Sequence, residues 1–161
     1  MTVDSLKMLD SLVDIYMPDF KYVTPALAKL ISAAEDYPES ALSAIKEMFR
    51  QVGGLTFDER GMAKKGMIIR HLVLPGNVDE TRRVLDCIAD NFPLDIHISL
   101  MSQYFPTHNA EKIPSLNRLL LPREYRRAVD YACSLGFTNV LTQEMSAASE
   151  SYVPSFEMTD F

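Results

Sequence analysis

Four short apolar runs alternate with helical patterns along this chain of 161 residues. Such alternation favours a parallel sheet, because parallel strands need a crossover connection that is usually a helix. The strand-like runs are "VDIYMPDFKY" (13–22), "GMIIRHLVLP" (66–75), "DIHISLMSQY" (95–104) and "TNVLTQEM" (138–145). They are almost continuously apolar, which is typical of strands covered on both faces. We therefore predict an α/β fold with about four mainly parallel strands and flanking helices.

The segments between these runs place apolar residues at helical spacing. We expect helices over 25–36, 38–52, 79–91 and 122–135, preceded by a short helix within 2–12. A polar excursion over 53–66 is typical of a small hairpin. The Ser-rich segment 146–161 lacks periodicity, so we predict one domain over 1–145 followed by an irregular tail over 146–161.

Four parallel strands without further partners would leave two open sheet edges. We therefore expect the sheet to be part of a larger structure. Three completions are consistent with the sequence. The missing strands can lie in a longer chain of which this is the C-terminal portion, in a separate N-terminal partner, or in a second copy of the same chain.

Composition narrows the class of protein. A formal net charge of −6 argues against non-specific nucleic-acid binding. No apolar run reaches membrane-spanning length, and no signal peptide is recognisable, so we expect a cytoplasmic protein. Cys87 and Cys133 lack metal-site spacing, and we predict that both are small buried hydrophobes.

"GMIIRHLVLPG" (66–76) raises the main functional question, because it places an arginine inside a strand-like run. Strand alternation puts Arg70 on the same face as Ile68 and Leu72, with His71 on the other face. On their own strands, Asp19, Lys21 and Gln103 lie toward the carboxyl ends, where α/β barrels build their active sites.

An Asp, a Lys and an Arg at the mouth of one barrel would suit a small zwitterionic or carboxylate-bearing ligand. The alternative is that Asp19, Lys21 and Arg70 pair with one another and bind nothing; spacing alone does not decide between the two. For His71 we predict a packing role facing the helices. His97 lies near the start of its strand, and we expect His108 to be solvated.

Several segments together resemble one family, the radical SAM proteins similar to pyruvate formate-lyase activating enzyme. They are "VDIYMPDFKY", "SAIKEMFRQVGGL", "GMAKKGMIIRHLVLPGNVDET", "ISLMSQYFP", "SLNRLLLPREYRRAVDYACSLGF" and "NVLTQE". The resemblance implies a partial (βα)6 TIM-like barrel. It also implies a [4Fe-4S] cluster with bound S-adenosylmethionine, whose reductive cleavage yields a radical that abstracts hydrogen. In activating enzymes the substrate is a glycyl radical enzyme.

The resemblance assigns cofactor-binding roles to a few residues of this chain. The strand resembling "MPDFKY" supplies Asp19 and Lys21 near S-adenosylmethionine, and the strand resembling "IIRHLVLPG" supplies Arg70. Relatives often carry a histidine on the next strand, where this chain has Gln103, a residue that still offers hydrogen bonds to an adenosine. No catalytic residue and no metal ligand is assigned to this chain.

Two signatures of the family are missing from the sequence. The CxxxCxxC motif, whose thiolates hold the cluster, is absent, and so is the "GGE" segment that binds the amino group of S-adenosylmethionine. We therefore expect the C-terminal portion of such a protein, inactive alone. The alternative is a non-catalytic module or subunit that binds a small carboxylate or a protein partner.

Overall fold

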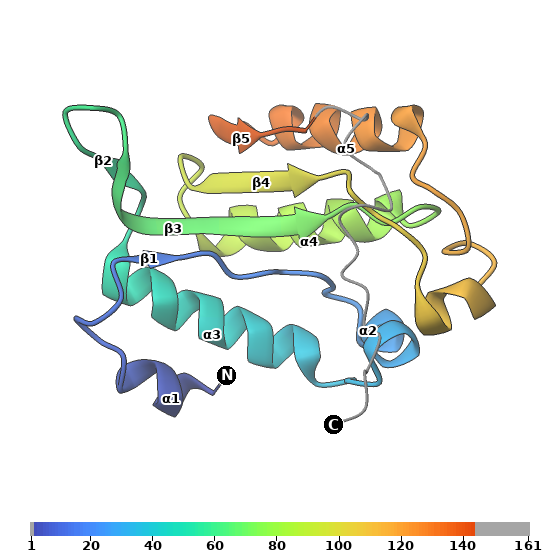
Figure 1. Cartoon of the computed structure of the whole chain (residues 1–161), viewed down its shortest axis with the longest axis horizontal. Coiled ribbons are helices and arrows are strands. Elements are labelled where there is room, and N and C mark those ends of the chain that lie inside the picture. Colours follow the sequence, from blue (N-terminus) through green and yellow to red (C-terminus); the bar gives the residue numbers. More distant parts are fainter. Residues whose placement is uncertain (1, 144–161) are drawn as a thin grey trace, which may run out of the picture.

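The computed structural model describes residues 2–143. The predicted tail over 146–161 and the end of the predicted strand over 138–145 lie outside the described residues, as does the side chain of His108. Within the described range the chain is an α/β protein. Its sheet is mainly parallel and is flanked by helices, an arrangement compatible with part of an α/β barrel (Figure 1).

Four strands form the parallel part of the sheet in the order β1-β3-β4-β5. They are β1 (Ile15–Tyr16), β3 (Ala63–Leu72), β4 (His97–Met101) and β5 (Asn139–Leu141). Strand β2 (Thr56–Phe57) pairs antiparallel with the start of β3, which confirms the predicted hairpin. The first strand is much shorter than the predicted range 13–22, and an isolated bridge between Asp19 and Arg70 continues its pairing.

The helices match the apolar periodicity. They are α1 (Val3–Lys7), α2 (Pro25–Ser32), α3 (Tyr37–Val52), α4 (Val78–Asn91) and α5 (Pro122–Ser134), with a 3-10 turn, η1 (His108–Lys112). Pro25 and Pro122 stand in the first turns of their helices, where the missing N–H costs nothing. Gly136 has φ of +88°, a left-handed conformation that ends the helical path just after α5.

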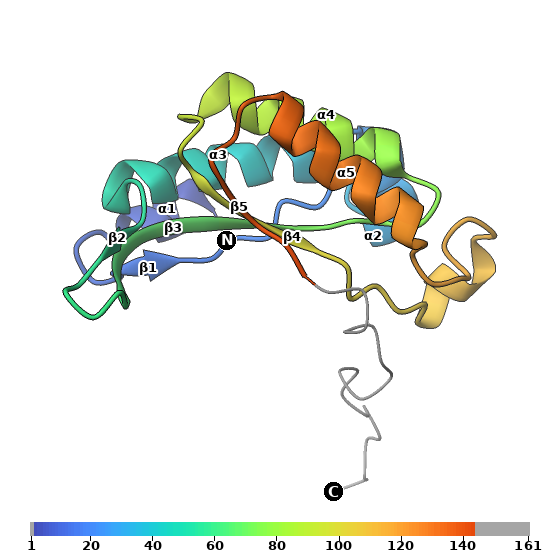
Figure 2. The ribbon, with the colours of Figure 1, turned by 90° about the horizontal axis from the view of Figure 1, so that it is seen from above.

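Helices α3, α4 and α5 lie together on one side of the sheet (Figure 2). No helix of residues 2–143 covers the opposite side. The expectation that both faces are covered is therefore wrong for the described part of the chain. We call the side without helices the open face.

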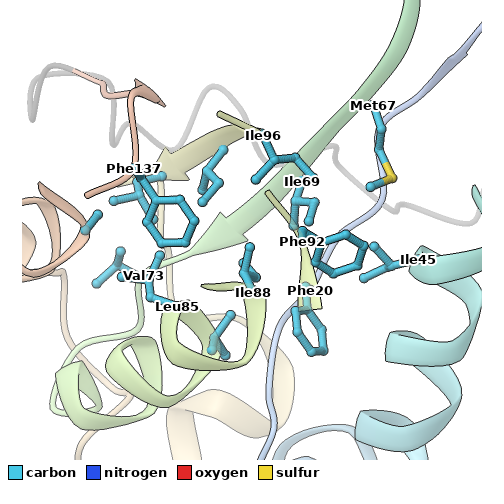
Figure 3. Close-up of a cluster of buried hydrophobic side chains, with 14 of the residues drawn as sticks. Phe20, Ile45, Met67, Ile69, Val73, Leu85, Ile88, Phe92, Ile96 and Phe137 are labelled. Carbon is cyan, nitrogen blue, oxygen red and sulfur yellow. The ribbon is translucent and has the colours of Figure 1, made fainter. Parts of the chain in front are cut away.

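The main core fills the space between the sheet and these helices (Figure 3). Strand β3 contributes Met67 and Ile69, and Val73 follows directly after it; all three are fully buried. Helix α4 presents Leu85 and Ile88, one turn apart, to the same cluster. A smaller cluster lies at the carboxyl ends of the strands and contains Tyr22, Ala28, Leu74, Tyr104 and Leu116.

Candidate binding site on the open face

The open face carries the residues that strand alternation predicts for it. In β3 the buried Ile69 and His71 point to the helices, whereas Ile68, Arg70 and Leu72 are only partly buried. Pairing places Arg70 beside Asp19 on one side and beside Ser99 of β4 on the other. A polar row therefore crosses the middle of this face.

Asp19 and Arg70 form an ion pair, with 2.7 Å between Oδ1 and Nη2. The pair is half-buried, with side-chain exposures of 36% and 38%. Two buried atoms, Asp19 Oδ1 and Arg70 Nε, nevertheless lack a hydrogen-bond partner of suitable geometry among the described residues. Oδ1 still lies 2.7 Å from the Arg70 guanidinium, and protein covers both atoms, so a ligand can meet only the exposed parts of the two side chains.

The backbone around Asp19 is fixed from two directions. The amide of Arg70 donates to the carbonyl of Pro18, and the amide of Phe20 donates to the carbonyl of Arg70, both at 2.9 Å. The hydroxyl of Tyr37, at the start of α3, donates to the carbonyl of Asp19 and accepts from the amide of Lys21, both at 3.0 Å. Asp19 is thus held in place although it lies beyond regular strand β1.

Lys21 lies at the rim of a separate cavity of about 300 Å³. Its side chain is exposed, and no ion pair joins its ammonium to any carboxylate of residues 2–143. The structure therefore brings Asp19 and Arg70 into contact but leaves Lys21 outside the pair. The alternative in which all three residues neutralise one another holds for only two of them.

Gln103 follows the end of β4 and is exposed. Its side chain makes no hydrogen bond to the described part of the chain. The structure therefore places Gln103 at the carboxyl end of the sheet, as alternation suggests, but does not join it to Asp19 or Arg70.

His71 has the packing role that strand alternation predicts. It is buried, and its Nδ1 donates to the carbonyl of Phe20 at 2.8 Å while Nε2 accepts from the hydroxyl of Thr81 at 2.9 Å. Burial lowers the pKa of His71. A neutral imidazole therefore fixes the segment after Asp19 to α4.

Three buried carboxylates escaped the sequence analysis: Glu47, Glu80 and Glu124. The last two organise loops at the carboxyl ends of the strands. Glu80 accepts hydrogen bonds from the amides of Val23 and Thr24 at 2.7 and 2.8 Å, and from the Thr24 hydroxyl. It thereby holds the N-terminal end of α2. Burial raises the pKa of Glu80, but these hydrogen bonds outweigh it and the net shift is downward.

Glu124 is the second such carboxylate. It binds Arg118 through both oxygens at 2.7 and 2.8 Å, and it accepts from the amides of Gly76 and Leu121. These contacts, led by Arg118, lower its pKa to about 2. A Glu three residues into a helix that starts with Pro122 is the capping signal that could have identified it.

The two cysteines do not fit an iron–sulfur cluster at the open face. Cys87 lies on α4 and packs against the core, and burial raises its thiol pKa. Cys133 lies on α5 and is exposed, so the prediction that both cysteines are buried is wrong for Cys133, and Cys87 is only partly buried. Both helices lie on the side of the sheet away from Arg70 (Figure 2). No group of metal-ligating side chains occurs among residues 2–143.

Comparison with known proteins leaves the function open. No protein-family model matches the chain. A curated relative, the uncharacterized protein MJ0674 of Methanocaldococcus jannaschii, is 29% identical over 133 residues, which are 82% of this chain. The chain spans 35% of the length of that relative. Among the described helices, none has the length and apolar character needed to cross a membrane.

Proposed function

We propose that this cytoplasmic chain is the S-adenosylmethionine-contacting, C-terminal portion of a radical SAM barrel similar to activating enzymes. The observation that carries the proposal is the half-exposed Asp19–Arg70 pair on the open face. S-Adenosylmethionine carries a carboxylate and an ammonium on one carbon. An arginine and an aspartate side by side offer a matching pair of charges.

Each residue then has a defined role. The exposed part of the Arg70 guanidinium binds the carboxylate. Asp19 accepts from the ammonium or from a ribose hydroxyl. Gln103, exposed at the same end of the sheet, contacts the outer parts of the ligand, whereas Lys21 lines a separate cavity.

The chain's own cysteines do not fit the cluster, so we assign no step of radical chemistry to this chain. The cluster-binding strands would come from a further segment that pairs with the open edge of β1. The share of the relative that this chain matches supports such a larger whole. A glycyl radical enzyme is the partner class that the family resemblance favours for the completed barrel.

Titration with S-adenosylmethionine, followed by two-dimensional amide NMR, tests the proposal on the chain itself. We expect saturable shifts at Asp19, Arg70 and Ser99. Arg70→Gln should weaken binding about tenfold or more, since a charge-assisted contact is lost. Arg127→Gln, on the exposed surface of α5, is the matched control and should leave binding unchanged.

Two results would overturn the proposal. One is the absence of saturable shifts at any of these residues, and the other is equal binding by wild type and Arg70→Gln. Anaerobic iron–sulfide reconstitution gives a separate check, because this chain alone should hold no stoichiometric cluster. A stoichiometric cluster that cleaves S-adenosylmethionine on this chain would show that the assignment of the cysteines is wrong.

A further inference from the structure

The cavity beside Lys21 is a second feature of the open side, distinct from the Asp19–Arg70 pair. Its volume is about 300 Å³, within the range of small-molecule pockets. Most of the residues that line it are apolar, among them Ile31, Leu72, Leu74, Ile113 and Leu116. Leu72 follows Arg70 by two residues on the same face of β3, so the cavity begins one pleat beyond the ion pair.

One hydrogen bond and one aromatic contact fix residues that line the cavity. The hydroxyl of Tyr104 donates to the carbonyl of Leu116 at 2.8 Å, which ties the end of the segment 105–116 to the residue just before its start. The Tyr22 ring meets Tyr37 edge-on, with 5.6 Å between the centroids. The residues that line the space come from the strand ends, from α2 and from the segment 105–116.

Charge is distributed unevenly around this space. Lys21 is the one charged residue among the described residues that line the cavity, and no Asp or Glu lines it. The nearest carboxylate along the strand, Asp19, is already paired with Arg70. An ammonium that forms no ion pair within the described residues, beside an apolar cavity, favours a ligand with one negative charge and an apolar body.

We propose that this cavity binds a small apolar monocarboxylate, with its chain or ring against Leu72 and Leu74 and its carboxylate on the Lys21 ammonium. The proposal does not depend on S-adenosylmethionine binding at Arg70. It assigns the chain a second ligand, placed within reach of the first.

Hexanoate and 1-hexanol are suitable probes, because they share an apolar chain and differ in charge. Binding is followed through the methyl NMR signals of Leu72, Leu74 and Leu116. We expect saturable hexanoate binding that is at least about tenfold tighter than that of 1-hexanol, which corresponds to about 1.4 kcal/mol. Lys21→Met should remove this preference and leave 1-hexanol binding within about twofold, because the apolar wall is unchanged.

Two further variants complete the design. Lys29→Met, an exposed lysine on α2 paired with Glu35, is the matched control and should keep the preference. Thr107→Trp places an indole into the cavity from the loop side and should abolish binding of both probes. This variant tests the site even if Lys21→Met unfolds, because Thr107 is a partly buried loop residue outside the core clusters.

Three outcomes would overturn the proposal. No saturable binding of hexanoate up to about 10 mM would show that the cavity is not a site of useful affinity. Equal binding of the two probes would show that Lys21 does not select a carboxylate. Competitive displacement of hexanoate by S-adenosylhomocysteine would assign the cavity to the cofactor itself. None of these outcomes decides whether S-adenosylmethionine binds at Arg70, which the Arg70→Gln comparison tests.

Discussion

Of the residues at the carboxyl end of the sheet, Glu124 is the one whose substitution we expect to lower the stability of the fold most clearly. Its carboxylate joins the loop after β3, through Gly76, to Arg118 and to the first turn of α5. Glu124→Gln keeps the size of the side chain but removes its charge. The substitution also replaces one of the two accepting oxygens with an amide donor.

The magnitude follows from the pKa. A carboxyl whose pKa falls from 4.5 to about 2 on folding gains up to about 3.4 kcal/mol at neutral pH, at about 1.36 kcal/mol per pKa unit. The Glu124 side chain is only 11% exposed, but that of Arg118 is 36% exposed, so water screens part of the attraction. We therefore expect Glu124→Gln to lower the free energy of unfolding by about 1.5–2 kcal/mol at pH 7.

The pH dependence gives a sharper test than the magnitude. Because folding depresses this pKa, the stabilisation is complete above about pH 5 and is lost as pH falls toward 2. Urea denaturation followed by circular dichroism at several pH values measures it. At pH 2.5 the difference between wild type and Glu124→Gln should shrink to about a quarter of its neutral value.

Glu59→Gln, in the exposed hairpin turn, is the matched control and should change stability by less than about 0.5 kcal/mol. Arg118→Gln alone and combined with Glu124→Gln closes a double-mutant cycle. The reasoning is refuted if the cost of Glu124→Gln is the same at pH 7 and pH 2.5. It is also refuted if the two substitutions are additive.

Two further predictions concern the strand that carries Arg70. Gly66→Ala should destabilise the fold by more than about 3 kcal/mol in urea denaturation, because Gly66 has φ of +131° and a Cβ there meets Gly54 and Leu55. Gly61→Ala, at φ of +76° in open space, should cost only about 1–2 kcal/mol, and an equal cost for both would contradict the close approach. The NMR titration midpoint of His71 should lie below its ordinary 6.5, because burial lowers its pKa. The native ring stays neutral while the unfolded ring gains a proton, so His71 lowers stability as pH falls below 6.5, and a midpoint at or above 6.5 would refute this.

Strand alternation was sufficient to predict the orientation of the site residues. It placed Arg70 and His71 on opposite faces, and the structure agrees, with His71 2% exposed and Arg70 on the open face. Helical periodicity likewise predicted α3, α4 and α5 to within a residue or two. Both results depend on neighbours a few positions away, which a sequence shows directly.

Contacts between distant segments could not be predicted in the same way. Asp19 lies beyond a two-residue strand, and its contact with Arg70 depends on a single bridge outside regular pairing. Glu80 holds the start of α2 from α4, across more than fifty positions of sequence. The cavity wall formed by 105–116 has no strand or α-helical period, so no local pattern marks it.

The distribution of these long-range contacts bears on function. Glu80, Glu124 and Tyr37 all fix loops or helix ends at the carboxyl end of the sheet. At the opposite end the β2–β3 hairpin leaves Phe57 and Met62 exposed. A third buried carboxylate, Glu47 in α3, is paired with Arg50 and Gln51. Buried carboxylates cost free energy unless they are fully paired, so the geometry of the carboxyl end of the sheet depends on the contacts of Glu80 and Glu124. That end also carries the Asp19–Arg70 pair and the Lys21 cavity, which is why we place both proposed ligands there.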